Sequence, residues 1–134
     1  MHRLTLTILA SLIPTFTAAQ EIVINRSNFV AAVGSNTLEI PLLRVQLHVL
    51  DDGQITGTAL GLKVTGEWDW KEGFFCRRMN WGERNLEYNC QQVTRDGKTL
   101  IFTSDKGTGR SAKFSLRSAT KLGQIIGADH TVTD

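Results

Sequence analysis

Residues 38–117 alternate between apolar and polar side chains, and this pattern limits the fold more than any other feature of the chain. In the segments 45–49 and 112–116, every second residue is apolar and the residues between them are polar. A period of two is typical of a β-strand that buries one face and exposes the other. The chain is therefore predicted to fold mainly as β-sheet.

Short polar and glycine-containing segments divide this region into strands. We predict turns at residues 51–53, 71–73, 96–97 and 105–109, and a polar loop over residues 80–85. Strands that follow one another through tight turns usually pair as a meander, and closing the sheet removes its edges. The expected fold class is all-β: a small antiparallel meander barrel or sandwich of about seven or eight strands.

One short N-terminal helix is expected before the strands. Ser27 is a good N-cap for residues 28–33, and Gly34 is suited to end the helix. Because Phe29 must be buried against another part of the protein, the helix is predicted to plug one end of the sheet structure.

The first 19 residues have the pattern of a signal peptide. Arg3 gives a basic start, residues 4–16 are apolar, and small residues at 17–19 suit cleavage before Gln20. The alternatives are a membrane anchor or a buried helix, but the stretch is too short and threonine-rich to span about 30 Å of hydrocarbon. We therefore expect a signal peptide at 1–19, a single β domain at 20–118 and a C-terminal tail at 119–134. The mature protein is expected to be periplasmic or secreted, with no membrane insertion after cleavage.

Cys76 and Cys90 are the only cysteines, and an oxidising compartment joins such a pair. The ring that they close has about 15 residues, for which chain entropy predicts a stabilisation of about 3 kcal/mol. A reactive thiol or a metal site is the alternative. Because the two cysteines with His48 and His130 match no recognised zinc spacing, the sequence favours a structural disulfide and predicts no metal site.

Composition excludes several classes of protein. With 41% hydrophobic residues and only 2 prolines in 134 residues, the chain is neither disordered nor fibrous. Its formal net charge is +2, whereas a protein that binds nucleic acid electrostatically needs a basic surplus to neutralise phosphates. We therefore expect no nucleic-acid partner.

The three tryptophans lie close together in the sequence. Trp68 and Trp70 share one face of a predicted strand, and we expect them to fill the interior opposite Gly57 and Gly66, where side-chain volume is missing. A tryptophan pair near arginines is also able to stack an aromatic, cationic or sugar ligand. Trp81 lies in the predicted polar loop and is the better candidate for a surface role.

Several arginines are candidates for holding a carboxylate or a phosphate. Arg77 and Arg78 are adjacent, so they must point to opposite faces of a strand and only one of them can face inward. An inward arginine is costly unless Glu67, Asp69 or Glu87 pairs with it. We expect such an ion pair, with an anion site or a solvated face as alternatives. The candidate residues for binding a ligand or partner are Trp81, Arg84, Arg78 and Arg110.

No catalytic residue and no cofactor are predicted. His48 is the only histidine in the predicted core of the domain and lies on the polar face of its strand, and no nucleophile elbow surrounds a serine. Residues 104–111 lack the spacing of a P-loop and do not open a helix, which favours a flexible hairpin turn over a phosphate site. Glu67 and Asp69 fit an exposed strand face better than a pair of glycosidase carboxylates.

Four segments resemble a family of small exported proteins from marine and phototrophic alphaproteobacteria: residues 65–78, 80–82, 88–91 and 102–112. The resemblance extends from about Phe29 to Arg117, and some members of the family carry the name dihydrodipicolinate reductase. This chain has neither the glycine fingerprint nor the alternating strand–helix pattern with which enzymes of that name bind a nucleotide, so no catalytic residue carries over. The resemblance implies export and a Cys76–Cys90 pair.

Two hypotheses of function follow. In the first, the protein is an exported, non-catalytic β-barrel module that binds a small ligand or a periplasmic protein through residues 81–84 and neighbouring basic residues. In the second, it is an enzyme, either a reductase, as the family name suggests, or a small hydrolase. Binding of NAD(P)H separates the two, because a reductase requires it.

Overall fold

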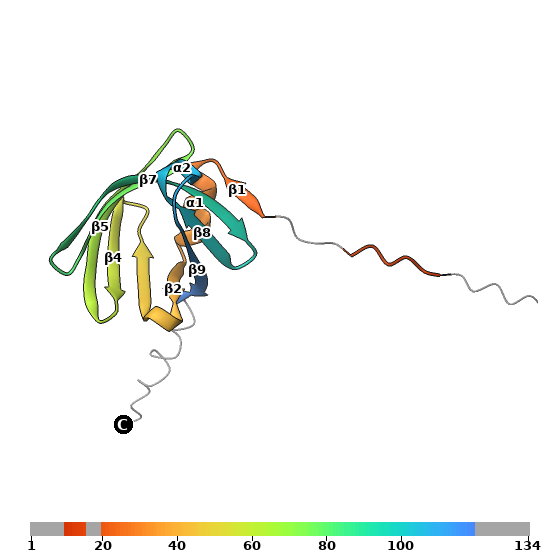
Figure 1. Ribbon diagram of the computed structural model, residues 1–134, viewed down its shortest axis with the longest axis horizontal. Coiled ribbons are helices and arrows are strands. Elements are labelled where there is room, and N and C mark those ends of the chain that lie inside the picture. The colour runs from red at the N-terminus through yellow and green to blue at the C-terminus, as the bar shows by residue number, and fades with distance from the viewer. Residues whose placement is uncertain (1–9, 16–19, 120–134) are drawn as a thin grey trace, which may run out of the picture.

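The computed structural model describes residues 10–15 and 20–119. They form a β-barrel with a short helix at one end (Figure 1). The strands are β1 (Glu21–Val23), β2 (Asn36–Ile40), β3 (Val45–Val49), β4 (Gln54–Ala59), β5 (Leu62–Lys71), β6 (Phe74–Trp81), β7 (Arg84–Asp96), β8 (Thr99–Thr103) and β9 (Ser111–Ser118). The helical elements are α1 (Arg26–Val33), the 3-10 helix η1 (Pro41–Leu43) and α2 (Ser104–Gly107).

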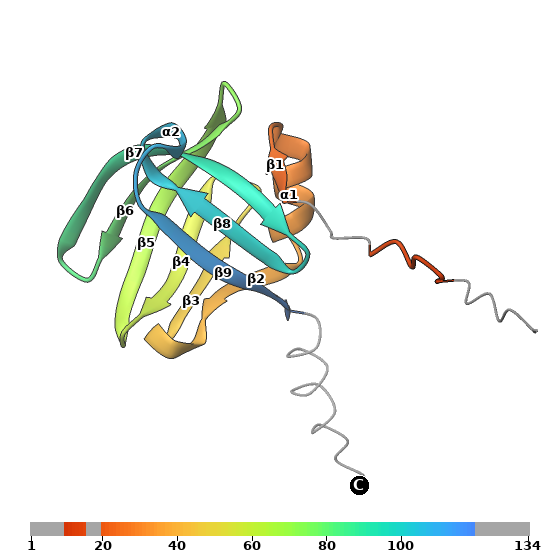
Figure 2. The same cartoon turned by 45° about the vertical axis from the view of Figure 1, so that its right-hand side comes forward.

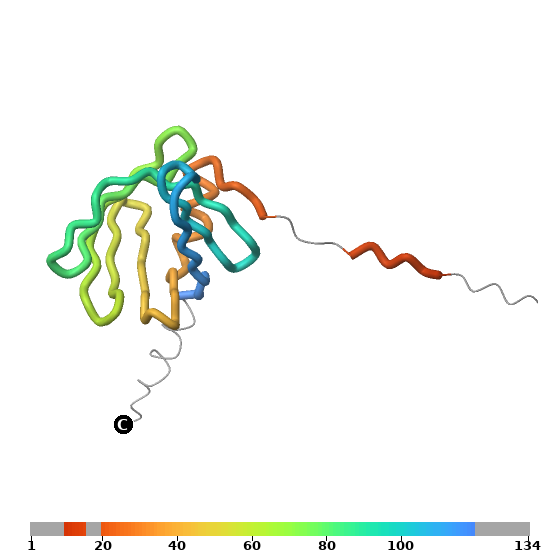
Figure 3. The backbone as a smooth tube through the Cα atoms, in the orientation of Figure 1, coloured from red at the N-terminus to blue at the C-terminus, as the bar shows by residue number. Residues whose placement is uncertain are grey.

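Strands β2 to β9 pair in chain order, each antiparallel to the next, and β9 pairs with β2 to close the barrel. The chain can be followed up and down around the barrel in Figure 3. β1 is an additional strand that pairs with Val93–Arg95 of β7, beyond the part of β7 that pairs with β6. The predicted all-β class and meander are therefore confirmed, and the closed barrel is the architecture found.

The alternation of residues along the strands determines the core. In β5, Val64 and Trp68 are buried, whereas Glu67 and Asp69 are exposed. A side chain at Gly66 would collide with the backbone of β6, so the two strands approach closely at this point. The predicted packing of Trp68 into the barrel interior is confirmed, and Trp70 packs partly buried against the same core.

Helix α1 packs at one end of the barrel, beside the strands (Figure 2). Phe29 is completely buried, and the centre of its ring lies 5.3 Å from that of Trp68, 5.1 Å from that of Trp70 and 5.0 Å from that of Phe75. This aromatic cluster confirms that the helix plugs one end of the sheet structure.

The predicted N-cap of this helix is wrong. Asn25 is the cap, because its Oδ1 accepts a hydrogen bond of 2.9 Å from the backbone N–H of Asn28. Ser27 lies within the first turn and its hydroxyl donates to the same oxygen. Gly34 ends the helix as predicted.

Four of the hairpins have two-residue turns. Leu60–Gly61 and Glu72–Gly73 have a positive φ at both residues, which defines a type I′ turn, and Gly82 and Gly97 have a positive φ at the first position, as in a type II′ turn. The predicted loop over residues 80–85 is therefore wrong, because β6 extends to Trp81 and β7 begins at Arg84. The hairpin predicted at 96–97 is present, with its turn one residue later.

Parts of two predicted segments lie outside the described residues. Of the predicted signal peptide, the structure describes only residues 10–15, and of the predicted tail it describes only Ala119, whose N–H donates to the carbonyl oxygen of Ser35. Among the described residues, none of the helices has the length and apolar character needed to cross a membrane.

Candidate functional site

The interior of the barrel leaves little room for a ligand. Its cavity has a volume of about 40 Å³, whereas pockets that bind small molecules have about 300–1,000 Å³. The lining is almost entirely apolar and consists of Leu38, Leu47, Val49, Ile55, Phe75, Met79, Gln91, Phe102 and Phe114. A ligand of the size of a metabolite does not fit into this cavity.

The two ends of the barrel differ. The ring of Phe29 packs on Trp68 and Trp70, near the last residues of β5, whereas the first residues of β5 lie at the other end. Three connections lie away from α1, on the side that we call the uncapped end: η1, the turn at residues 60–61 and the turn at residues 82–83. In Figure 1, η1 and the β4–β5 turn lie at the bottom of the barrel.

Hydrogen bonds hold these connections together. The indole Nε1 of Trp81 donates to the carbonyl oxygen of Ala59 at 2.8 Å, and the N–H of Gly82 donates to the carbonyl oxygen of Lys63 at 2.8 Å. A groove of about 440 Å³ between η1 and the β4–β5 turn is lined by both polar and apolar residues, namely Glu39, Pro41, Arg44, Val45, Gln46, Thr58 and Gly61. The hydrogen bonds thus link the β6–β7 turn to the β4–β5 turn, and the groove separates the β4–β5 turn from η1.

Four leucines are exposed at the uncapped end, and we call them the leucine rim. The exposed fraction is 92% for Leu42, 46% for Leu43, 46% for Leu60 and 49% for Leu62. A single exposed leucine is normal on a protein surface, whereas a group of exposed apolar side chains marks an interaction site. The leucine rim is therefore a candidate contact surface.

Leu60 also has an unfavourable backbone conformation. Its φ is 51°, in the left-handed region that costs an L-amino acid with a bulky side chain roughly 1–2 kcal/mol. Asn, Asp or Gly is the usual residue at this position of a type I′ turn. The fold thus accepts an apolar side chain that neither suits the turn nor is buried.

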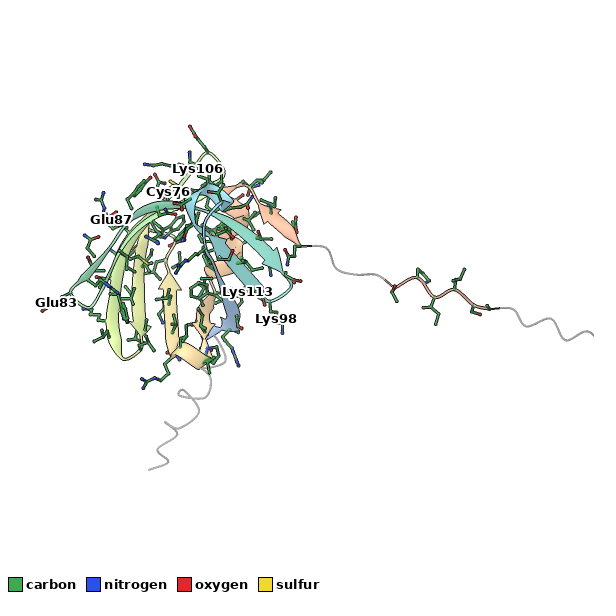
Figure 4. The ribbon with its side chains drawn as sticks, viewed as in Figure 1. Cys76, Glu83, Glu87, Lys98, Lys106 and Lys113 are labelled. Atoms are coloured by element: carbon green, nitrogen blue, oxygen red, sulfur yellow. A yellow bond between two sulfur atoms is a disulfide. The ribbon has the colours of Figure 1, made fainter. Side chains whose placement is uncertain are left out.

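Basic side chains accompany the leucine rim. Arg44 directly follows Leu43, Lys63 directly follows Leu62, and Arg84 pairs with Trp81 across the β6–β7 turn. All three cations are exposed. Of the nearby acids, Glu83 lies at the tip of this turn, at the left edge of Figure 4, and Glu39 forms an ion pair of 3.3 Å with Arg117. The surface therefore combines apolar tips with a positive charge.

Of the four predicted binding residues, the structure brings Trp81 and Arg84 together but not the other two. Trp81 is half-buried against the core and Arg84 is exposed. Arg78 is exposed on the other face of β6, where its guanidinium carbon lies 5.9 Å from the centre of the Tyr88 ring. Arg110 lies in the connection between α2 and β9, and its carbonyl oxygen accepts a hydrogen bond from the N–H of Ser104.

The ion pair expected for Arg77 or Arg78 is not formed. Arg77 is the inward residue, since it pairs with the buried Trp68 in the neighbouring strand. Its Nη1 donates to the carbonyl oxygen of Glu87 at 2.7 Å, and its Nε has no partner among the described residues. Burial lowers the pKa of this guanidinium, because desolvation disfavours the charged form. A backbone carbonyl thus takes the place of the expected carboxylate.

Cys76 and Cys90 form a disulfide that links paired positions of β6 and β7. Cys76 is buried beneath the outer surface, and the thiol and metal alternatives are therefore set aside for these two residues. Next to the disulfide, Tyr88 lies beneath two cations, Lys71 at 5.8 Å and Arg78 at 5.9 Å from the ring centre. Tyr88, Lys71 and Arg78 thus form a second surface cluster, in which Tyr88 is the one aromatic side chain.

The connection between β8 and β9 is more ordered than the predicted flexible hairpin. Residues 104–107 form the single turn α2, with a positive φ at Asp105 and Lys106. Asn89 holds this turn in place, because its Nδ2 donates to Asp105 Oδ1 at 2.7 Å and its Oδ1 accepts from the Asp105 N–H at 3.0 Å. In the described ranges, no three His, Cys, Asp or Glu side chains gather in a way that could hold a metal ion.

Comparisons with known proteins add no relative to this description. No protein-family model matches the chain, and neither the curated proteins nor the solved structures give a match.

Of the residues at the uncapped end, the sequence predicts a binding role for Trp81 and Arg84 only, and it gives no prediction for the leucine rim. The available signal was Leu60–Gly61, in which a leucine precedes the glycine of a turn between two alternating strands. The Pro41-Leu42-Leu43 segment was a second signal, because Pro favours a turn and two adjacent leucines cannot both enter one core.

Proposed function

We propose that the protein is an exported, non-catalytic β-barrel module that binds a partner through its uncapped end. The contact surface consists of the leucine rim together with Trp81 and Arg84. The observation that carries this proposal is the exposure of four leucines at one end of a barrel whose other end is plugged by α1.

The small interior cavity supports contact at the surface over storage of a ligand inside. An exposed apolar group at the surface needs no internal volume, because the partner covers it from outside. Arg84 and Trp81 lie at the edge of the leucine rim, and arginine and tryptophan are both residue types that are enriched in protein interfaces.

Export is part of this proposal. It is supported by the leader pattern of residues 1–19, by the disulfide between the only two cysteines, and by the resemblance to small exported alphaproteobacterial proteins. The mature chain is then expected to start at Gln20 in the periplasm or the medium.

A photo-crosslinking residue placed at Leu60 tests the proposed surface in the cells that export the protein. Ile24 is the matched control position, because it is also exposed but lies at the α1 end, where its carbonyl oxygen accepts from Trp70 Nε1. We expect covalent adducts from position 60 and few from position 24. Absence of adducts at position 60, or equal yields at the two positions, would contradict the proposal.

A further inference from the structure

We infer that the partner of the uncapped end is an anionic membrane surface, to which the folded barrel binds peripherally without spanning it. This inference rests on the proposed function and adds the chemical class of the partner. Three observations on the leucine rim lead to it: the shape of the surface, the strained display of Leu60 and the arrangement of charge.

The shape of the uncapped end suits a deformable apolar phase. Its leucines lie on two separate connections, with Leu42 and Leu43 on η1 and Leu60 and Leu62 at the β4–β5 turn. The groove between these connections is lined by both polar and apolar residues, and none of the four leucines is among them. A protein partner usually presents its anchors to well-packed pockets, whereas a lipid interface accepts each protruding side chain separately.

The conformation and the exposure of Leu60 both lower the stability of the folded state. It occupies a left-handed turn position with a φ of 51° and remains 46% exposed. An asparagine would adopt this turn conformation at a lower energetic cost. A polar side chain at this exposed position would also be better hydrated than leucine. Glu72 occupies the corresponding position in the β5–β6 turn with the same φ, so the turn type itself does not require leucine. Insertion into an apolar phase would remove the cost of exposing this side chain to water, whereas the cost of the backbone conformation remains.

The cations are placed to contact lipid headgroups. Arg44 and Lys63 are the residues directly after the rim leucines Leu43 and Leu62. Long basic side chains extend to the polar interface while apolar neighbours enter the hydrocarbon, and anionic lipids attract them. Trp81 packs half-buried beside the leucine rim and its Nε1 donates to the carbonyl oxygen of Ala59, so the leucines and the cations make the contact with lipid.

Acidic side chains do not cancel this charge. Glu83 is the acid at the tip of the β6–β7 turn, where it is next to Arg84. Glu39 is already paired with Arg117. Arg44 and Lys63, which flank the leucines most closely, form no ion pair among the described residues. The charge of the uncapped end is therefore complementary to a negative surface.

Sedimentation with vesicles tests the inference on the full mature chain. Vesicles of phosphatidylglycerol and phosphatidylcholine are compared with vesicles of phosphatidylcholine alone, at low and at high salt. We expect stronger binding to the anionic vesicles and a loss of binding as salt screens the cations. Equal binding to both compositions, or no binding to either, would overturn the inference.

Single substitutions assign the binding to the leucine rim. Leu42→Asn should weaken partition by at least about tenfold, because burial of the leucine is lost. Lys63→Gln should weaken it roughly fivefold. The controls are Ile24→Asn at the α1 end and Lys98→Gln at the β7–β8 turn, on the opposite side of Figure 4 from Glu83. Thermal unfolding of each variant confirms folding, and a Leu42→Asn variant that binds like the Ile24→Asn control contradicts the inference.

The crosslinking experiment distinguishes failure of this inference from failure of the proposed function. If vesicles do not bind and position 60 forms adducts with a protein, the membrane inference is wrong and the uncapped end remains a binding surface. If vesicles do not bind and position 60 forms no adduct, both are wrong. Lipid adducts at position 60 together with anionic vesicle binding support both.

Discussion

The side chain of Asn25 determines where α1 begins. It accepts the hydrogen bond from the N–H of Asn28, and Ser27, which has an equally suitable side chain, does not. Both residues are good N-caps in general, so composition alone does not distinguish them. The choice depends on the chain that leads from β1 into the helix, which sequence periodicity does not describe.

Asn25→Ala is predicted to lower the free energy of unfolding by about 1 kcal/mol, because the cap is lost. Ser27→Ala is the matched control and should change it by less than about 0.5 kcal/mol. Urea denaturation measures both values. A larger loss in the serine variant than in the asparagine variant would show that the cap is assigned to the wrong residue.

Arg77 shows why inward charges are hard to predict. The sequence correctly requires that Arg77 and Arg78 face opposite sides, but the contact of Arg77 with the Glu87 carbonyl depends on local geometry. A register shift between Arg77 and Met79 in the pairing of β6 with β7 changes which atoms of β7 lie within reach. Bulges of this kind are set by the tertiary structure.

Arg77→Met is predicted to change the free energy of unfolding by less than about 1 kcal/mol, because the guanidinium is only half-buried and solvent screens much of its charge. Burial lowers the pKa of the guanidinium, so the folded state disfavours the charged form at every pH below that pKa. Removing the charge relieves this cost across the whole neutral range, and no carboxylate is left unpaired. Urea denaturation at neutral pH that shows a loss above about 1 kcal/mol would mean that the Glu87 contact dominates.

At the scale of elements, α1 closes one end of the barrel. Its buried face consists of Phe29, Ala32 and Val33. The sequence predicts that the helix closes the barrel because a large apolar side chain such as Phe29 must be buried against another part of the protein. Only the structure shows which residues provide it: Trp68, Trp70, Phe75 and Phe102.

Phe29→Ala is predicted to lower the free energy of unfolding by about 3–5 kcal/mol, because it leaves a cavity among these rings. Asn28→Ala, at an exposed position of the same helix, should cost less than about 1 kcal/mol. Denaturation curves of the two variants separate loss of packing from loss of helix. Similar small losses in both would contradict the role of α1 as a plug.

The disulfide connects the two long strands of one hairpin. The double variant Cys76→Ala with Cys90→Ala should lose about 3 kcal/mol of stability, since the bond closes a ring of about 15 residues. Reduction of the natural protein should give a similar loss and should not affect the double variant. An unchanged denaturation midpoint on reduction would show that the bond does not contribute to stability.

At the scale of the whole molecule, the meander and the position of most turns follow from the alternation and the glycines. The closure of the barrel does not, because pairing of β9 with β2 joins residues about 80 positions apart and depends on the accumulated twist of the sheet. Only two residues of the candidate site were predicted from the sequence, and their role in binding stays a prediction. Trp81 and Arg84 were predicted to lie in a polar loop, whereas they are paired residues of β6 and β7. The alternation of apolar and polar residues does not reveal the leucine rim beside them, because these leucines lie in or next to turns.

The most direct test is to measure Leu60→Asn for both folding and binding. If the leucine rim serves binding and not folding, asparagine should raise the free energy of unfolding by about 0.5–1 kcal/mol, because it tolerates the left-handed turn position. The same variant should bind anionic vesicles more weakly and give fewer adducts from a crosslinker at Arg84. A variant that is less stable and binds as before would show that Leu60 supports the fold, and would contradict the assignment of the uncapped end as the binding surface.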